Sequence, residues 1–524
     1  MVVRHPAMQL PEKRRPCKPQ DILLVDLPKP FHQLQIPKQC LCNESKGLAE
    51  RVLRVVPETE SRALSRWNNA LDVIQSQLRI CPVLDEFSLM SCLPKSKKRQ
   101  YSEALQSLLE APLTTQDSHI KAFVKMEKAE LIPLTELPQL TDMKDPRIIQ
   151  ARHPRFNVKL GKFTRAIETS IKLLRDPDLP LLDLPLIAKG HNLERRARTL
   201  MRMWNLMERP RAVSLDLSRW DMHVSEAMLL GLRDFYLKCY PSPLLRELLQ
   251  SLTNNRCKTT QGIKYSRKSG VTSGDMTTAL GNCLAVVASC LALRTLLGES
   301  VTDADVKWSR QQTGEGGRIW ESILELKRKH NMLKPREMLM YDDGDDHILI
   351  VEEEAVPLIQ AVLPLWWKLL GHKLTSSHVL DRLEELEFCQ MKLCPQLGTM
   401  VPDPRKTVAT SLCLTGNYRK DWGKYLHTVW RCRAMMHNGV PVLGPLFHRL
   451  SAQVQKFGLL EEQESRAVLM RQQYWMQLSH KLLEEEYVYQ PPTAEARNWM
   501  NLAWKIDQET QMEMESLRVK LPYD

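Results

Sequence analysis

The chain has 524 residues, 43% hydrophobic and 26% charged, with a formal net charge of +12. This composition excludes a disordered chain, which would carry too few apolar side chains to offset the entropy lost on ordering, and the length predicts several packed subdomains. The positive charge favours a polyanionic partner, nucleic acid first and an anionic membrane surface second.

The N-terminal part is the least regular. Residues 1–46 are rich in proline and basic side chains, which predicts an extended arm lying across the body. A short basic cluster at 95–99 is typical of solvated surface, with a nuclear signal or an RNA contact as alternatives. Residues 121–175 hold twelve Lys and Arg against six Asp and Glu, so half of the net charge lies there.

A strand leading into a helix is predicted in the middle of the chain. Residues 213–217 form a short apolar run, and helical periodicity begins at Ser225. The most apolar run, 279–297, contains Asn282 and Arg294, so it predicts a buried helix rather than a membrane span. The thirteen cysteines are scattered singly, which favours a reducing compartment over a disulfide framework.

Two β-prone runs, 338–341 and 347–351, flank an acidic turn that contains Gly344, and they predict a hairpin with acidic residues at its tip. The C-terminal third is helix-prone. Its apolar residues at helical spacing are interpreted as core: Trp499, Leu502, Ala503 and Ile506.

The aspartates suggest a magnesium site. Asp216 ends the predicted strand and Asp345 lies at the hairpin tip, so they meet if the two strands are neighbours, with Asp346 as a third ligand. Nucleotidyl transfer uses two divalent ions about 3.5 to 4 Å apart, and carboxylates suit Mg²⁺. Calcium in an EF-hand loop is excluded, because Gly344 stands third after Asp342 instead of sixth.

A second pattern lies between these aspartates. Ser273, Gly274, Thr278 and Asn282 form SGxxxTxxxN, a glycine-containing loop that opens a helix with Thr278 and Asn282 one turn apart. Taken alone, Gly-Asp-Asp is weak evidence, because it fits an exposed charged turn equally well. What identifies the class of protein is the order in which the strand, the loop and the hairpin follow one another along the chain.

These stretches resemble the motifs of tombusvirus-like viral RNA-dependent RNA polymerases. SLDLSRWDMHVS at 214–225 resembles their motif A, SGDMTTALGNCL at 273–284 their motif B and GDD at 344–346 their motif C. FVKMEK at 123–128 and PRIIQARHPRFN at 146–157 resemble motif F, while EFCQ at 387–390 and DPRK at 403–406 extend the match.

The resemblance implies roles for individual residues. Asp216, Asp345 and Asp346 would bind two Mg²⁺ ions, with Mn²⁺ as a substitute, and Asp221 with Asn282 would recognise the ribose 2′ hydroxyl. That hydroxyl both donates and accepts, which an amide beside a carboxylate can match. Other nucleotide-binding residues would be Ser273, Gly274, Thr278, Lys125, Lys128, Arg147, Arg152 and Arg155.

The resemblance also implies an α+β right-hand polymerase. Its parts would be an N-terminal arm at 1–46, fingers with basic motif F at 47–210, a palm at 211–395 with an antiparallel sheet and interleaved fingers segments, and a mostly helical thumb at 396–524. Expected partners are RNA template and product, ribonucleoside triphosphates and a viral accessory replication protein. Contact with membranes would be indirect, in replication complexes of the host cytoplasm.

Lys373 stands where motif D of polymerases places a general acid for pyrophosphate, although a lysine after a helix C-terminus is also stabilised by the dipole alone. The sequence departs from the family pattern in three places. Ala151 stands where proline is expected, Asp342 and Asp343 add two acids that could perturb metal affinity, and residues 297–337 are longer than usual, with 309–334 expected as a surface excursion.

Three other classes remain as alternatives. A reverse transcriptase shares the palm aspartates but usually carries an aromatic steric gate near the position of Asp221 and lacks the Ser-Gly to Asn pattern. A catalytically inactive RNA-binding subunit would be free to lose its carboxylates, yet all three are present. A generic basic nucleic-acid-binding module accounts for the charge but not for the ordered motifs.

Overall fold

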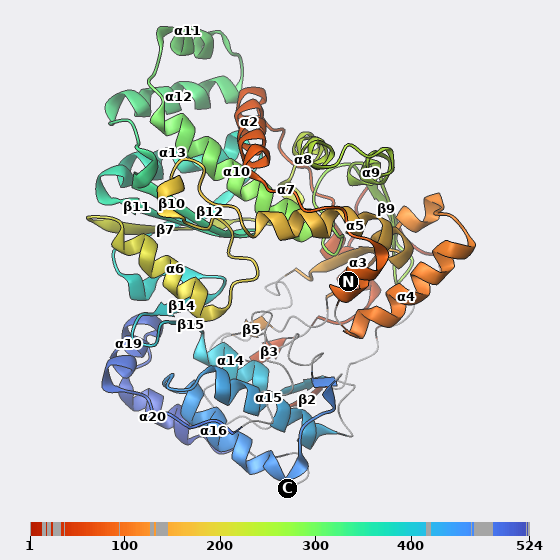
Figure 1. The fold of residues 1–524 in the computed structure, drawn as a ribbon, viewed down its shortest axis with the longest axis vertical. Coiled ribbons are helices and arrows are strands. Elements are labelled where there is room, and N and C mark those ends of the chain that lie inside the picture. Colours follow the sequence, from red (N-terminus) through yellow and green to blue (C-terminus); the bar gives the residue numbers. More distant parts are fainter. Residues whose placement is uncertain are drawn as a thin grey trace.

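The computed structural model describes residues 2–12, 17, 22–24, 33–35, 37–93, 95–125, 130–132, 145–415, 421–462, 464–465, 486–519 and 521. Within these ranges, helices surround several mostly antiparallel sheets (Figure 1). The mixed α+β class expected from the sequence is confirmed.

A four-stranded antiparallel sheet occupies the middle of the molecule. Its strands, in spatial order, are β10 (Met338–Asp343), β11 (Asp346–Glu352), β7 (Pro210–Leu217) and β12 (Leu374–Leu380). In β10, Met338 and Met340 belong to one hydrophobic core, whereas Leu339 and Tyr341 belong to another. Because both faces are buried, the strands read as continuous apolar runs, and the predicted hairpin is confirmed.

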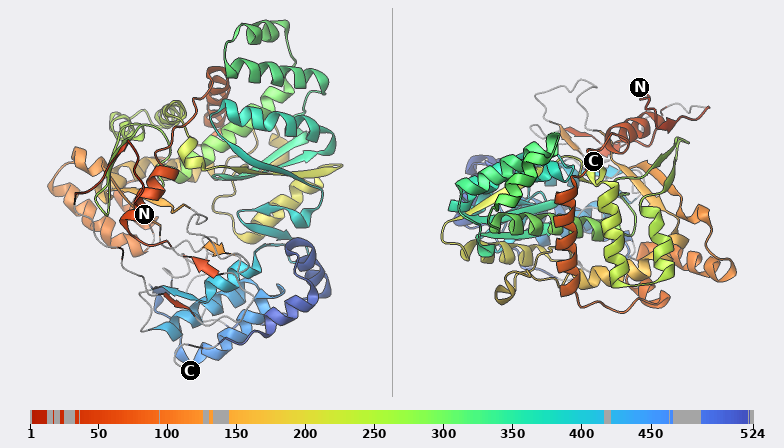
Figure 2. Two further views of the ribbon diagram at one scale, coloured as in Figure 1. Left: turned by 180° about the vertical axis from the view of Figure 1, so that it is seen from behind. Right: turned by 90° about the horizontal axis from the view of Figure 1, so that it is seen from above.

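Helices cover both faces of this sheet (Figures 1 and 2). One core contains α2 (Ser61–Gln77), α8 (Glu226–Cys239), α10 (Thr278–Gly298) and α13 (Val356–Leu369). The other contains α6 (Leu193–Asn205) and a small sheet of β13 (Glu387–Phe388), β14 (Met391–Cys394) and β15 (Thr399–Pro402). The strand-then-helix prediction holds for β7 and α8, with the short α7 (Trp220–His223) between them.

Helix α10 is buried almost along its whole length. Among the described helices it is the one long and apolar enough to cross a membrane, and 94% of its most apolar stretch lies inside the protein. The prediction of a buried helix at 279–297 is therefore confirmed.

A second, five-stranded sheet has the order β1 (Met8–Gln9), β9 (Lys264–Arg267), β8 (Asn255–Thr259), β4 (Ile120–Val124) and β6 (Ile148–Arg152). Its apolar face packs against α1 (Leu41–Arg51). Nearby helices are α3 (Glu86–Ser91), α4 (Lys95–Glu110), α5 (Pro154–Ile171) and α9 (Pro243–Leu249).

The described parts of the N-terminal arm reach two distant parts of the molecule. β1 pairs with β9, whereas β2 (Ile22–Leu24) pairs with β16 (Cys413–Thr415) in the C-terminal part. A third strand, β3 (Gln33–Gln35), pairs with β5 (Glu130–Ile132). The predicted boundary at residue 46 is late, because α1 begins at Leu41, four residues after the last proline of the arm.

The long segment at 297–337 folds into α11 (Asp303–Gln311) and α12 (Glu315–Lys329). Helix α11 projects from the body (Figure 1), but Trp320 and Ile323 of α12 enter the large core. The expected surface excursion is thus only partly correct, because α12 packs an apolar stripe inward.

The C-terminal part has a core of its own. Its helices are α14 (Pro404–Ser411), α15 (Trp422–Met436), α16 (Leu443–Val454), α19 (Ala494–Trp504) and α20 (Gln508–Ser516). Trp499, Ala503 and Ile506 are buried as predicted, but the core assignment of Leu502 is wrong, since it is 42% exposed. Helix α19 ends before Lys505, whose left-handed backbone breaks the periodicity.

Candidate active site

Strand pairing brings the motif A and motif C aspartates to one end of the four-stranded sheet. Strand β11 lies directly beside β7, and their antiparallel ladder aligns Ile348 with Ser214. The ladder ends at this pair, and Asp346 and Asp216 each lie two residues beyond it, so both aspartates are at the same end of the paired strands. Asp345 lies in the adjoining turn, beside Gly344 with φ of +78°. Both Asp216 and Asp345 are exposed.

Asp221 and Asn282 are in direct contact, as the motifs imply. Asn282 Nδ2 donates to Asp221 Oδ1 over 3.0 Å, joining α7 to the first turns of α10. The amide oxygen of Asn282 is buried and has no hydrogen-bond partner among the described residues. A Cβ at Gly344 would lie 3.8 Å from Asn282 Cβ, so the hairpin tip is adjacent to this pair.

The carboxyl groups of the site also influence one another's pKa values. Burial raises the pKa of Asp221 to about 6, and the charge of Asp345 adds to the effect while Arg267 and Arg147 oppose it. Limited solvation raises the pKa of Asp346 to about 7, again reinforced by Asp345. Burial and the neighbouring carboxylate thus both disfavour the charged form of these groups, which is a setting that suits added positive charge.

The two additional acids lie at the end of β10, within the hairpin. Asp342 is completely buried, its carboxyl oxygens have no hydrogen-bond partner among the described residues, and burial raises its pKa well above the usual value. Asp343 accepts a hydrogen bond from the buried Arg196 and lies 4.0 Å from Lys189 Nζ. Both acids are thus held within the protein, although Asp343 adds to the raised pKa of Asp346.

The Ser273-Gly274 loop rests on β6. Gln150 N donates to Ser273 O over 2.6 Å, and Thr278 Oγ1 donates to Thr272 O over 2.6 Å at the start of α10. Gly274 has φ of +111°, and a Cβ there would come within 3.1 Å of Ile149. Glycine is therefore required for both the backbone conformation and the close approach.

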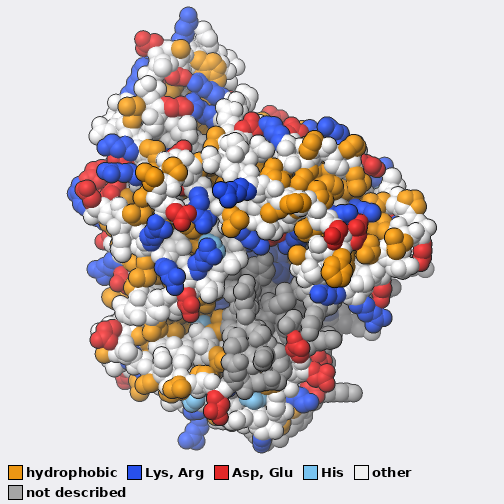
Figure 3. Space-filling view, in the orientation of Figure 1, with side chains coloured by type: hydrophobic (Ala, Val, Ile, Leu, Met, Phe, Trp, Pro, Cys, Tyr) orange, Lys and Arg blue, Asp and Glu red, His pale blue; other side chains and the backbone are white. Residues whose placement is uncertain are grey.

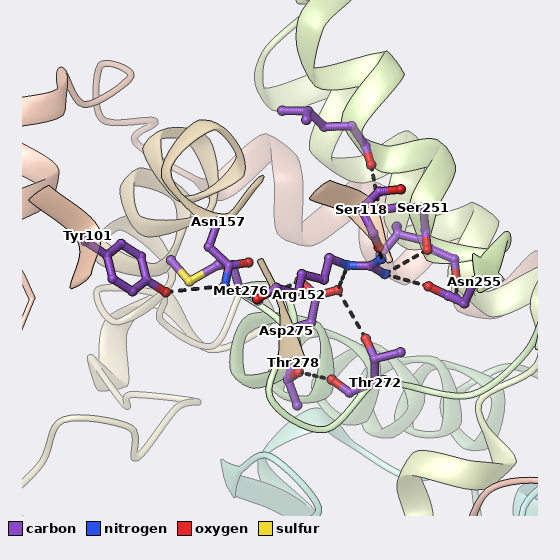
Figure 4. Close-up of polar contacts among 12 residues, drawn as sticks. Tyr101, Ser118, Arg152, Asn157, Ser251, Asn255, Thr272, Asp275, Met276 and Thr278 are labelled. Carbon is purple, nitrogen blue, oxygen red and sulfur yellow. Dashed lines mark hydrogen bonds and ion pairs between the residues drawn. The ribbon is translucent and has the colours of Figure 1, made fainter. Parts of the chain in front are cut away.

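Arg152 lies at the wall of the cleft beside Gly274, but its guanidinium is engaged within the protein. Its side chain is fully buried, and Nε lies 2.5 Å from Asp275 Oδ2 (Figure 4). The remaining guanidinium nitrogens donate to Ser118 O, Ser251 O and Asn255 Oδ1 over 2.6, 2.9 and 2.7 Å. Arg152 falls on the buried side of β6, where alternate residues point inward, so the structure gives it a supporting role.

Arg155 is likewise a structural residue. Its guanidinium donates to the carbonyl oxygens of Ser107, Ala111 and Pro112 over 2.7, 2.8 and 2.6 Å, so it joins the start of α5 to the end of α4. Its Nε also lies 3.2 Å from Asp117. Both Arg155 and Arg152 thus have structural partners while they line the cleft at Gly274, and their contact with nucleotide stays a prediction.

Arg147 remains on the surface at the site. It is exposed, and its charge opposes the rise in the pKa of both Asp221 and Asp346, so it contributes positive charge to the site. Lys125 N donates to Arg147 O over 2.8 Å, so the backbones of the two residues lie side by side. Lys128 lies outside the described residues. Figure 3 shows further Lys and Arg side chains over the middle of this face.

Lys373 lies at the same end of the sheet as Asp216. Ser218 N donates to Lys373 O over 2.9 Å, and Ser376 pairs with Asp216 across β12 and β7. The lysine is exposed and follows α13 after Gly371, whose φ is +83°. Its role as a general acid stays a prediction.

Sequence reasoning missed two supporting groups. Asp275 was interpreted only as part of motif B, yet it accepts a hydrogen bond from the buried Arg152. The sequence signal for this partner was a charged residue between a glycine-containing loop and an apolar helix. His372 stacks on Trp220 with ring centroids 4.2 Å apart. His372 directly precedes Lys373 in the chain, and Trp220 directly precedes Asp221. No local pattern predicts a contact between residues so far apart in the chain.

No group of three or more His, Cys, Asp or Glu side chains in the described part of the chain is already arranged as a metal-binding cluster. The exposed carboxylates at the sheet end still provide hard oxygen donors, which is the donor type that Mg²⁺ uses together with water and substrate oxygens. The donor chemistry fits magnesium, with the substrate completing the coordination.

Known proteins resemble the chain along most of its length. The sequence profile of the family described as viral RNA dependent RNA polymerase matches residues 8–302 and 324–522, so the gap falls within the long segment at 297–337. Proteins named RNA-directed RNA polymerase from tobacco necrosis virus (strain A), tomato bushy stunt virus (strain Cherry) and carnation mottle virus are 26%, 29% and 24% identical.

These alignments cover 86%, 78% and 85% of this chain, but only 58%, 46% and 54% of the respective relatives. The chain thus spans about half the length of the curated relatives that it matches. Because the family profile matches far more than half of the chain, in the order of the motifs described above, the chain belongs to the viral RNA-dependent RNA polymerase family.

Proposed function

We propose that the chain synthesises RNA on an RNA template from ribonucleoside triphosphates and thereby replicates a positive-strand viral genome. The observation that carries this proposal is the meeting, at one end of the β7–β11 pair, of motif A and motif C aspartates with the Asp221–Asn282 contact. Membership of the family supports the same activity.

The chemistry would be two-metal nucleotidyl transfer. A pair of Mg²⁺ ions, or Mn²⁺ in their place, supplies Lewis-acid activation of the 3′ hydroxyl and neutralises charge on the triphosphate. Asp216, Asp345 and Asp346 are the proposed ligands, and all three residues are exposed at the surface. Arg147 and Lys125 supply positive charge for the triphosphate, and Lys373 is the proposed proton donor to pyrophosphate.

Asp221 and Asn282 would select ribose over deoxyribose. Their side chains are already joined by a hydrogen bond, and the amide oxygen of Asn282 has an unused acceptor position. A 2′ hydroxyl entering this pair can donate to an oxygen and accept from the amide, whereas a deoxyribose leaves these polar groups unpaired.

The right-hand arrangement belongs to the same proposal. The five-stranded sheet with its helices would lie in the fingers (47–210, with interleaved segments), the four-stranded sheet in the palm (211–395) and the separate C-terminal core in the thumb (396–524). We also propose work with a viral accessory protein in membrane-associated complexes of the host cytoplasm, a proposal that rests on the family resemblance.

The decisive experiment supplies purified protein with an RNA template, four labelled ribonucleotides and Mg²⁺. We expect complementary RNA from the wild type and none from Asp345→Ala, while RNA binding is retained. Asp303→Ala, a fully exposed aspartate of α11, is the matched control and should keep wild-type synthesis. Equal synthesis by Asp345→Ala would refute the site, and preferential use of deoxynucleotides would indicate a reverse transcriptase.

A further inference from the structure

The five-stranded sheet carries a row of lysines across three neighbouring strands. Lys121 of β4 pairs with Lys258 of β8, and Lys258 pairs with Lys264 of β9. At its two ends the row meets neutral residues, since Lys121 pairs with Ala151 of β6 and Lys264 pairs with Gln9 of β1. Since neighbouring strands lie about 4.8 Å apart, the three lysines span about 10 Å.

Strand alternation puts all three lysines on the outer face. In β8, Arg256 and Lys258 are exposed while Cys257 between them is buried, and in β9 Lys264 is exposed while Tyr265 is buried. The buried residues form the core with α1 on the other face of the sheet. The lysine face is therefore open surface.

Within the described part of the chain, no acidic side chain forms an ion pair with this row. No described salt bridge involves Lys121, Lys258 or Lys264, and the depression of about 680 Å³ beside them is lined by Arg256 and His119 but by no Asp or Glu. Like charges placed directly opposite each other destabilise a sheet. The row therefore costs folding free energy that a bound polyanion would recover.

The row leads into a second cleft. Lys121 also lines a cleft of about 1010 Å³ between α4, α5 and the loop at Gly274. Phe123, two residues from Lys121 on the same face, is half-buried and lines this cleft as well. A basic track beside an aromatic ring is the combination that binds single-stranded nucleic acid, through phosphate contacts and base stacking.

We propose that the row formed by Lys121, Lys258 and Lys264 binds the phosphodiester backbone of single-stranded RNA outside the catalytic centre and directs the strand into the cleft at Gly274. The inference rests on the proposed function for its choice of RNA. It concerns binding alone and requires no chemical step.

The test measures the affinity of a fluorescent single-stranded oligoribonucleotide by anisotropy at several salt concentrations, without Mg²⁺ or nucleotides. The variant is K121Q/K258Q/K264Q. Loss of three phosphate contacts should lower the affinity about tenfold or more and reduce the slope of log K against log salt by about 2.

A matched control removes three exposed positive charges elsewhere, as K307Q/R310Q/K329Q on α11 and α12. Both variants should keep the wild-type melting temperature, because the substituted side chains are exposed. An unchanged affinity and slope for the sheet variant, or a loss equal to that of the control, would overturn the proposal. An equal loss for blunt duplex RNA would overturn the single-strand assignment.

Primer–template substrates with short and long template overhangs identify which strand is held. If the row holds template that awaits copying, K121Q/K258Q/K264Q should lose only the additional affinity that the longer overhang gives the wild type. If the variant binds every substrate more weakly, whatever the overhang length, the row binds RNA at another stage. Since binding needs no turnover, the assay also works in the Asp345→Ala background, and a failure of the proposed function would leave its result intact.

Discussion

Replacing Arg152 by methionine tests the reassignment of this residue from nucleotide contact to structural support. Methionine preserves much of the length but leaves the Asp275 carboxylate buried without its cation, and both side chains are fully buried. Removing one partner of a buried ion pair costs about 3 to 5 kcal/mol. The acceptors Ser118 O, Ser251 O and Asn255 Oδ1 also lose their donor.

This loss of free energy should destabilise mainly the loop around Asp275. At about 1.4 kcal/mol per factor of ten, the opening equilibrium of residues 272–278 should rise about a hundredfold or more. Hydrogen exchange of these amides, read by mass spectrometry, measures this locally, which is preferable to global unfolding in a chain with several cores. Ribonucleotide incorporation should fall at the same time.

Arg147→Met provides the contrast. Arg147 is exposed near the carboxylates, so its loss should raise KM for ribonucleotides while loop protection stays at the wild-type level. If Arg152→Met shows wild-type exchange at 272–278 and only a raised KM, the structural assignment is refuted. A double variant with Asp275→Asn should lose less than the sum of the single changes, since no buried charge remains unpaired.

Three further outcomes are expected. Asn282→Ala should reduce discrimination against deoxynucleotides about tenfold or more, measured as the ratio of kcat/KM values; unchanged discrimination would contradict its role. Asp346 keeps its proton up to about pH 7 in the folded protein but not when unfolded, so in EDTA its contribution to stability is lost as pH rises from about 4 to 7, and melting curves of Asp346→Asn should lack that component. Gly274→Ala should lower synthesis, because its Cβ would lie 3.1 Å from Ile149 at a φ of +111°, whereas Gly398→Ala, at a φ of +60° but with open space around it, should not; equal effects would count against a special loop geometry.

Local patterns predicted the elements that carry the acidic residues. The alternation and glycine of the hairpin, the short strand of Asp216 and the apolar helix after Thr278 are all encoded within a few neighbouring residues, and the structure has each of them. The Asp221–Asn282 contact was reached through the family resemblance, and the hydrogen bond is present.

Long-range contacts were beyond such patterns. In a segment rich in arginine, composition does not reveal which guanidinium points inward, so Arg147 and Arg152 look alike in sequence although one is exposed and the other buried. The partner of Arg152, Asp275, lies 123 residues away. The end of α19 was missed for a different reason, because it depends on the left-handed backbone of Lys505.

The pairing of the N-terminal strands sets a mechanical condition on the whole molecule. One short strand is hydrogen-bonded to β9 and the next to β16, so a single stretch of chain is tied to regions that are otherwise distant in sequence (Figure 1). Any widening of the gap between those regions must be taken up by the chain between β1 and β2, which forms the tether, or break the main-chain hydrogen bonds of one pairing. Proteolytic removal of the tether would free the two regions from that restraint without altering a single carboxylate of the centre.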